Sequence, residues 1–185
     1  RLAEGGDAVA ARELYQLLSA CLQAGNQGLA PDSAAMRRCE GVTAAQTAEA
    51  LDWLQRAARG GDDLAAIRWA DHLGDSQEGF EAWEALWRRG ELRALNALAR
   101  LYERGVPAST GGVPDPVSAH AYELVDFHVR EAVYSKFQGL AGTVTRHSDR
   151  MRSAGGLLNP QQHEEAQALA RQILSSNANC CRGNW

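Results

Sequence analysis

The sequence lacks long apolar runs, strand-like alternation and basic clusters. No apolar run approaches the roughly 18 residues that a membrane-spanning helix needs, so we expect no membrane span. β-branched residues are scarce and no apolar–polar alternation extends beyond a few residues, so nothing indicates a sheet. The 19 Lys and Arg residues are dispersed among 23 acidic ones, for a net charge of -4. Nucleic-acid binding normally needs a basic face, and we do not expect it here.

Motifs for catalysis and metal binding are also missing. The sequence has no CxxC or Cys/His cluster for zinc, no Gly-rich phosphate loop and no serine in a nucleophile elbow. His128 and Glu131 have the three-residue spacing of helical metal ligands, but no second such pair accompanies them. We therefore expect no enzymatic activity, no cofactor and no bound metal. A hydrolase with an unrecognised site is the alternative from another class.

Helix-forming residues dominate instead, chiefly Ala, Leu, Glu, Arg and Gln. Cap signals mark helix starts, such as the Thr43–Gln46 capping box and Asn159 before Pro160. These patterns predict an all-α protein, and a length of 185 residues suits one domain with a continuous core. The expected helices cover 7–24, 43–59, 62–72, 77–89, 92–104, 115 to 134 or 137, and 160–174.

One pattern occurs three times: Gly, an acidic residue, then Ala and two bulky apolar residues at intervals of four. The copies are Gly6-Asp7 with Ala10, Leu14 and Leu18; Gly61-Asp62 with Ala65, Trp69 and Leu73; and Gly90-Glu91 with Ala94, Leu98 and Tyr102. Residues four apart lie on one side of a helix, so each copy describes a helix whose buried side starts small and becomes bulky. Gly before an acidic residue marks the end of one helix and the start of the next.

The third copy is the fullest and continues into a second helix. It reads Gly90-Glu91-x-x-Ala94-x-x-x-Leu98-Ala99-x-Leu101-Tyr102-x-x-Gly105-Val106, followed by Asp115-Pro116-x-x-Ala119-x-Ala121-Tyr122, with 107–114 inserted in the turn. This pattern resembles the Sel-one-like repeat, a relative of the tetratricopeptide repeat. The resemblance covers roughly residues 3 to 135 and implies an α/α solenoid of about three helical pairs. It divides the single domain 1–185 into repeats over 1–135, a C-terminal capping region over 136–174 and a cysteine-containing tail over 175–185.

The resemblance also implies a function, because such proteins mostly bind other proteins on a concave face lined by first helices. In this sequence that face would carry Arg12, Gln16, Ile67, Asp71, Asn96 and Arg100. An ordinary solvated helix face is the alternative.

The tryptophans allow two interpretations. Trp53, Trp69, Trp83 and Trp87 suit a core between repeats. Alternatively, Trp87, beside Arg88 and Arg89, is a binding anchor that projects into a groove.

Four cysteines indicate the compartment. An even number with two flanking one long loop suits an oxidising environment, and we favour a Cys21–Cys39 disulfide over the other pairings, with Cys180 and Cys181 left in the tail. Four free thiols in a cytosolic protein are the alternative. Because the chain begins with Arg1 rather than Met, we expect a removed signal sequence and a periplasmic or secreted protein, possibly from a lipid-anchored precursor.

Together these patterns predict a non-catalytic protein-binding module of the bacterial cell envelope. Its partner would be an envelope component or, alternatively, an exported toxin that it neutralises as an immunity protein.

Overall fold

The structure is a computed structural model that describes residues 3, 5–30, 32–134 and 158–177. The secondary-structure elements of these residues are all helices, with no strand among them, which confirms the all-α prediction. The chain divides into two compact units, Arg1–His72 and Leu73–Trp185. Each unit is described by itself, so the single domain and the solenoid of three helical pairs stay predictions.

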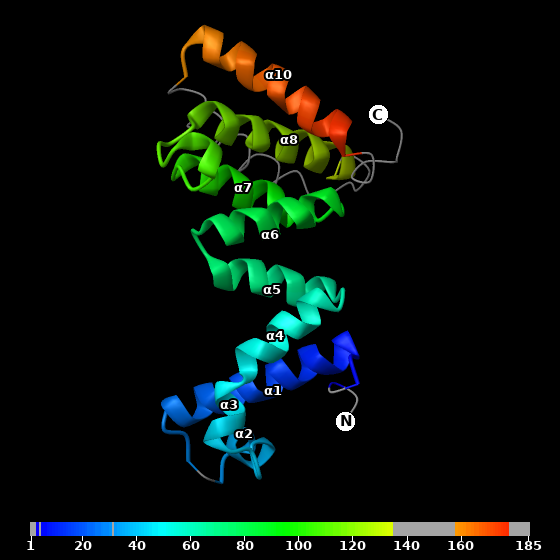
Figure 1. Cartoon of the computed structure of the whole chain (residues 1–185), viewed down its shortest axis with the longest axis vertical. Helices are drawn as coiled ribbons and strands as arrows, with labels where there is room; N and C mark the ends of the chain where they lie inside the picture. Colours follow the sequence, from blue (N-terminus) through cyan, green and yellow to red (C-terminus); the bar gives the residue numbers. More distant parts are fainter. Residues whose placement is uncertain (1–2, 4, 31, 135–157, 178–185) are drawn as a thin grey trace. The chain divides into compact units, whose positions relative to one another are not determined.

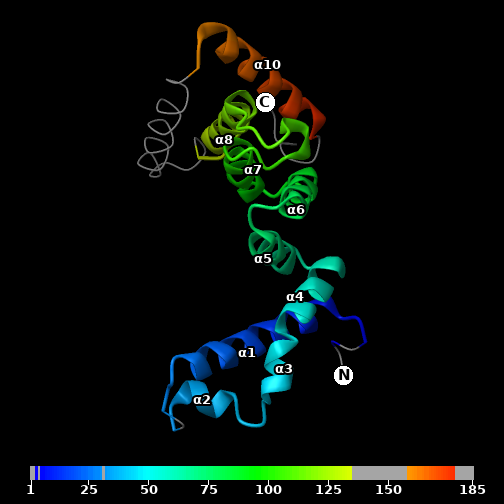
Figure 2. The same cartoon turned by 60° about the vertical axis from the view of Figure 1, so that its left-hand side comes forward.

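The first unit is built around the contact between its longest helix and α4. Its helices are α1 (Ala8–Asn26), α2 (Ala34–Arg38), α3 (Ala44–Ala48), α4 (Ala50–Arg59) and α5 (Asp63–Leu73), the last ending one residue beyond the unit (Figure 1). α1 packs against α4 (Figure 2), and the buried core comprises Ala11, Leu18, Ala50, Trp53, Leu54, Ala57 and Ala65. The helices approach closely because small residues meet: a Cβ on Gly60 would lie 2.8 Å from the Ala8 Cβ.

Two details of this unit differ from the prediction. The expected helix over 43–59 is two helices, α3 and α4, which are separated at Glu49. The Thr43–Gln46 capping box at its start is present as predicted. The connection after α1, predicted as one long loop, contains the short helix α2.

The repeated Gly–acid junction ends one helix and starts the next, as the sequence predicts. Gly61 and Gly90 have φ angles of 92° and 90°, which glycine adopts without steric cost. At the first junction the Gly61 N–H donates to the Ala58 carbonyl, and the Asp62 N–H donates to the Ala57 carbonyl. Gly90 and Glu91 repeat this pair of bonds at the end of α6, and both sets form the Schellman motif that satisfies the last carbonyls of a helix.

The described residues of the second unit form four α-helices that pack in chain order. They are α6 (Gln77–Arg88), α7 (Arg93–Glu103), α8 (Pro116–Tyr134) and α10 (Pro160–Ser176). α6 packs against α7, α7 against α8, and α8 against α10 (Figure 1). Aromatic rings connect the first three layers, since Tyr102 of α7 contacts both Phe80 of α6 and Tyr122 of α8. The predicted helix beginning at Asn159 is therefore confirmed as α10, and it covers α8.

The inserted segment 107–114 forms one short 3-10 helix, η1 (Ala108–Thr110). The Ala108 N–H donates to Gln77 Oε1 at 2.8 Å. Arg104, just before the insertion, forms an ion pair with Asp75. These contacts tie the insertion to the start of α6. Residues 136–157 of the predicted capping region and the tail cysteines Cys180 and Cys181 lie outside the described residues.

Candidate protein-binding surface

α7 has one fully buried side and one polar side. Ala94, Leu95 and Leu98 have no exposed surface, because this side of the helix packs between α6 and α8. Arg100 is exposed and Asn96 partly exposed, as expected for residues outside the buried stripe. α7 thus places two of the predicted binding residues at a surface of the second unit.

Arg100 differs from Arg93 of α7 and from Arg104, which directly follows that helix. Arg93 forms an ion pair with Glu91 at 3.1 Å, and Arg104 pairs with Asp75. The guanidinium group of Arg100 makes no ion pair or hydrogen bond with any residue of the described chain. An unpaired arginine beside two paired ones is a charge that an external carboxylate could bind.

Arg12, in contrast, is occupied within the first unit. Its Nη1 donates to Asp62 Oδ2 at 2.9 Å, and the two side chains are 19% and 5% exposed. The other oxygen of Asp62 accepts the Ala65 N–H at 2.8 Å and so caps the start of α5. Arg12 therefore ties α1 to the start of α5 and is a structural residue. Gln16 and Asp71, also predicted for the binding face, are exposed in the same unit.

Two predicted surface residues are buried, and these assignments are corrected. Trp87 is 5% exposed, because Phe80, Trp83 and Trp87 follow one another on the side of α6 that forms the core. Its backbone carbonyl accepts a hydrogen bond from the Asn177 side chain. Ile67 is also 5% exposed and lies one turn before the buried Ala70 on α5. Neither side chain is available as an anchor, and the core interpretation holds for Trp87.

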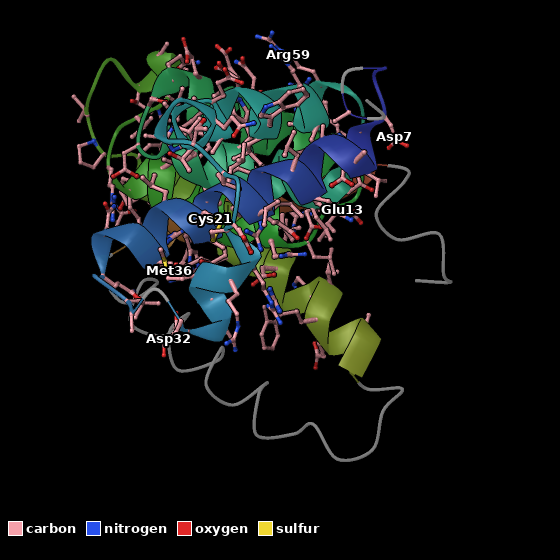
Figure 3. All side chains as sticks on the ribbon, turned by 90° about the horizontal axis from the view of Figure 1, so that it is seen from below. Asp7, Glu13, Cys21, Asp32, Met36 and Arg59 are labelled. Atoms are coloured by element: carbon pink, nitrogen blue, oxygen red, sulfur yellow. A yellow bond between two sulfur atoms is a disulfide. The ribbon has the colours of Figure 1, made fainter. Side chains whose placement is uncertain are left out.

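The disulfide predicted between Cys21 and Cys39 is present, with the two Cα atoms 5.5 Å apart. It joins α1 to the residue that follows α2 (Figure 3, where Cys21 and Met36 are labelled). α2 has no buried residue of its own. The cross-link is therefore a principal contact that holds this part of the connection against α1.

A buried polar cluster lies where α8 meets α10, and sequence reasoning missed it. His120 is 4% exposed and Glu123 is 8% exposed, and the His120 Nδ1 lies 3.5 Å from Glu123 Oε2. The His163 ring of α10 contacts the His120 ring edge-on at 5.1 Å. The sequence drew attention to His128 and Glu131, which have the same spacing but are exposed. The sequence could have indicated this cluster, because His120 and Glu123 lie at helical spacing among the apolar residues that form the core side of α8.

Next along α8, Asp126 is also buried, and its Oδ1 accepts from Arg130 Nε at 2.7 Å. A buried acid paired with a partly exposed arginine one turn later keeps its charge compensated. His120, Glu123 and Asp126 are thus all buried, whereas His128 and Glu131 lie on the exposed side of α8.

Burial raises the pKa of the Tyr122 phenol, and the nearby charges of Tyr102 and Glu84 raise it further, whereas Arg88 lowers it. The pKa of Tyr102 is raised by burial, then by Glu84 and Asp115. Their rings stack with centroids 5.5 Å apart. Both phenols are therefore neutral at physiological pH, and this layer contributes aromatic packing.

Among the described residues, no group of three or more His, Cys, Asp or Glu side chains could hold a metal ion. No helix in that part of the chain is long and apolar enough to cross a membrane. No protein-family model matches the chain, and neither a curated protein nor a solved structure matches it.

Proposed function

We propose that this chain is a non-catalytic protein-binding module that works outside the cytoplasm, built from repeats that resemble the Sel-one-like family. The observation that carries the proposal is the polar side of α7, where Arg100 is exposed and unpaired within the described chain next to the partly exposed Asn96. A rigid helix whose opposite side is fully buried holds such side chains in place, which reduces the entropy cost of binding.

Two further observations support the proposal. The Cys21–Cys39 disulfide is compatible with an extracytoplasmic protein. His120 and Glu123 of α8 are buried, and the His120 ring contacts His163 of α10, so these titratable side chains of the second unit do not lie at its surface.

The test begins with affinity capture from an envelope extract of the source cells, followed by titration of the purified partner against single variants. Arg100→Glu should weaken binding by about tenfold, through the lost pairing and through repulsion of the partner's carboxylate. Arg171→Glu on α10 is the matched control, because Arg171 is also exposed and makes no ion pair within the described chain. Equal binding of the parent and the Arg100→Glu protein would contradict the proposed surface.

The partner's identity separates the two versions of this function. An envelope protein would indicate a scaffold or adaptor. A toxin whose activity falls stoichiometrically when the chain is added would indicate an immunity protein.

A further inference from the structure

The segment that the disulfide holds has no fully buried residue among its described positions, although the partly buried Val42 packs against the core. Residues 27–43 separate α1 from α3, a connection much longer than the two to eight residues usual between packed helices. Within it, α2 is capped by Ser33, whose side chain accepts the Met36 N–H, and none of its residues is buried. Long ordered connections in compact proteins are commonly functional.

α2 ends in two adjacent arginines, Arg37 and Arg38, and both are exposed. Neither guanidinium group makes an ion pair or hydrogen bond within the described chain. The sequence has one other adjacent pair, Arg88 and Arg89, but there Arg88 bonds Glu84 at 2.8 Å.

Helix capping does not explain the pair fully. Arginines at the end of a helix do compensate its dipole, but a helix of five residues gains little from this. Asp32 and Glu40 flank α2, are exposed, and also make no ion pair within the described chain. Because these neighbouring carboxylates do not pair with Arg37 or Arg38, both guanidinium groups can bind a carboxylate of another protein.

Two exposed leucines lie between the cross-linked cysteines, one on the last turns of α1 and one after that helix. Leu22 follows the cross-linked Cys21 and is 46% exposed, and Leu29 is 39% exposed. A combination of arginine with exposed apolar surface is typical of protein-binding sites.

We propose that α2, held by the Cys21–Cys39 disulfide, is a second recognition surface whose Arg37 and Arg38 bind an acidic segment of a partner protein. The inference rests on the proposed protein-binding function but uses a surface other than α7. The net charge of the chain is -4, so an acidic segment is repelled in general and binds only where cations are locally concentrated. The disulfide supplies the preorganisation that a helix without buried residues lacks.

The probe is a fluorescein-labelled Gly/Ser peptide with four consecutive glutamates, titrated at about 0.15 M salt with anisotropy as the readout. Arg37→Glu/Arg38→Glu should lower the affinity by about tenfold or more. Arg59→Glu/Arg68→Glu is the matched control, with the same change of charge at exposed arginines of the same unit, and should stay within about twofold. Equal losses in the two double variants would show general charge attraction and would overturn the proposal, as would a parent chain that does not bind the peptide.

Two further variants separate this inference from the proposed function. Arg100→Glu should leave peptide affinity within about twofold of the parent, and a loss only in this variant would place the acidic site on α7 and overturn the α2 assignment. Cys21→Ser/Cys39→Ser should weaken peptide binding several-fold, because α2 then lacks its tether. If the Cys21→Ser/Cys39→Ser protein binds the peptide as tightly as the parent, the disulfide is not needed for this recognition surface. The comparison of the Arg37→Glu/Arg38→Glu and Arg59→Glu/Arg68→Glu proteins still decides whether α2 binds the peptide, even if the cysteine variant loses helical content.

Discussion

Arg12 and Asp62 are 50 residues apart in the chain, and their side chains meet at 2.9 Å, Nη1 to Oδ2. Asp62 is the acidic residue of the second repeat copy, and Arg12 lies on the helix of the first. The carboxylate serves both helices, since its second oxygen caps α5 through the Ala65 N–H. A residue that the sequence predicts as a helix-start signal thus also connects successive copies of the repeat within the first unit.

Asp62→Ala should destabilise the chain by about 2–3 kcal/mol, because it removes a helix cap and leaves Arg12 without its acid. Asp62→Asn retains a capping oxygen and should cost less. A double-mutant cycle with Arg12→Met, measured by urea unfolding, should give a coupling of about 1 kcal/mol or more. Gln16→Ala is the exposed control on α1. A coupling near zero would mean that the contact adds nothing beyond the cap.

The requirement for a small residue at the first buried position of the repeat can be tested at Ala94 of α7. Ala94 has no exposed surface, so Ala94→Leu should overpack the contact and lower stability by about 1–3 kcal/mol. Arg100→Leu on the polar side should change stability by less than about 0.5 kcal/mol. Thermal melts followed by circular dichroism compare the two. Similar melting losses for both variants would show that the two sides of α7 are wrongly assigned.

Trp87 tests whether this ring belongs to the core or to a binding site. Since Trp87 is 5% exposed, Trp87→Ala should cost about 3–5 kcal/mol of folding stability. A surface anchor would behave differently, with parental stability and weakened partner binding. Urea unfolding and partner titration of the same preparation separate the two outcomes.

Local signals in the sequence predict the helix boundaries well. The Asn159–Gln162 capping box starts α10 as predicted, because its bonds link residues only three apart. α2 was missed because five residues without a buried side chain produce no apolar periodicity. The break at Glu49 was missed for a related reason, since the apolar pattern continues across it.

The direction in which a side chain faces is harder to predict. The repeat register predicts Ile67 at a surface, and the neighbouring Arg88 and Arg89 suggest the same for Trp87, but burial depends on which neighbouring helix covers that side. The partner of Arg12 could not be found from local sequence, because the two residues are brought together only by packing of α1 against the α4–α5 junction. The same holds for His120, whose contact with His163 joins two helices distant in the chain.

The Tyr102–Tyr122 layer predicts a loss of stability in alkaline solution. A tyrosine in the unfolded chain titrates near 10, and burial raises the pKa of Tyr122 above that value in the folded chain. The folded state therefore holds the phenolic proton more firmly, and this contribution to stability is fully present below about pH 10. It is lost as the pH rises above 10 towards the folded-state pKa, because the unfolded chain then gives up the proton first.

Tyr122→Phe cannot ionise, so its stability should fall less steeply than the parent's above pH 10. Near pH 7 the two proteins should differ little, because the ring and its stacking on Tyr102 remain. Urea-unfolding midpoints at about pH 8, 10 and 11 measure the slope for both, with Tyr15→Phe in the first unit as a control for removing a phenol elsewhere. If the Tyr122→Phe protein loses stability as steeply as the parent, the buried phenol is not the source of alkaline unfolding. The raised pKa of Tyr102 would then be the next to test with Tyr102→Phe, because burial and the charges of Glu84 and Asp115 all favour its neutral form.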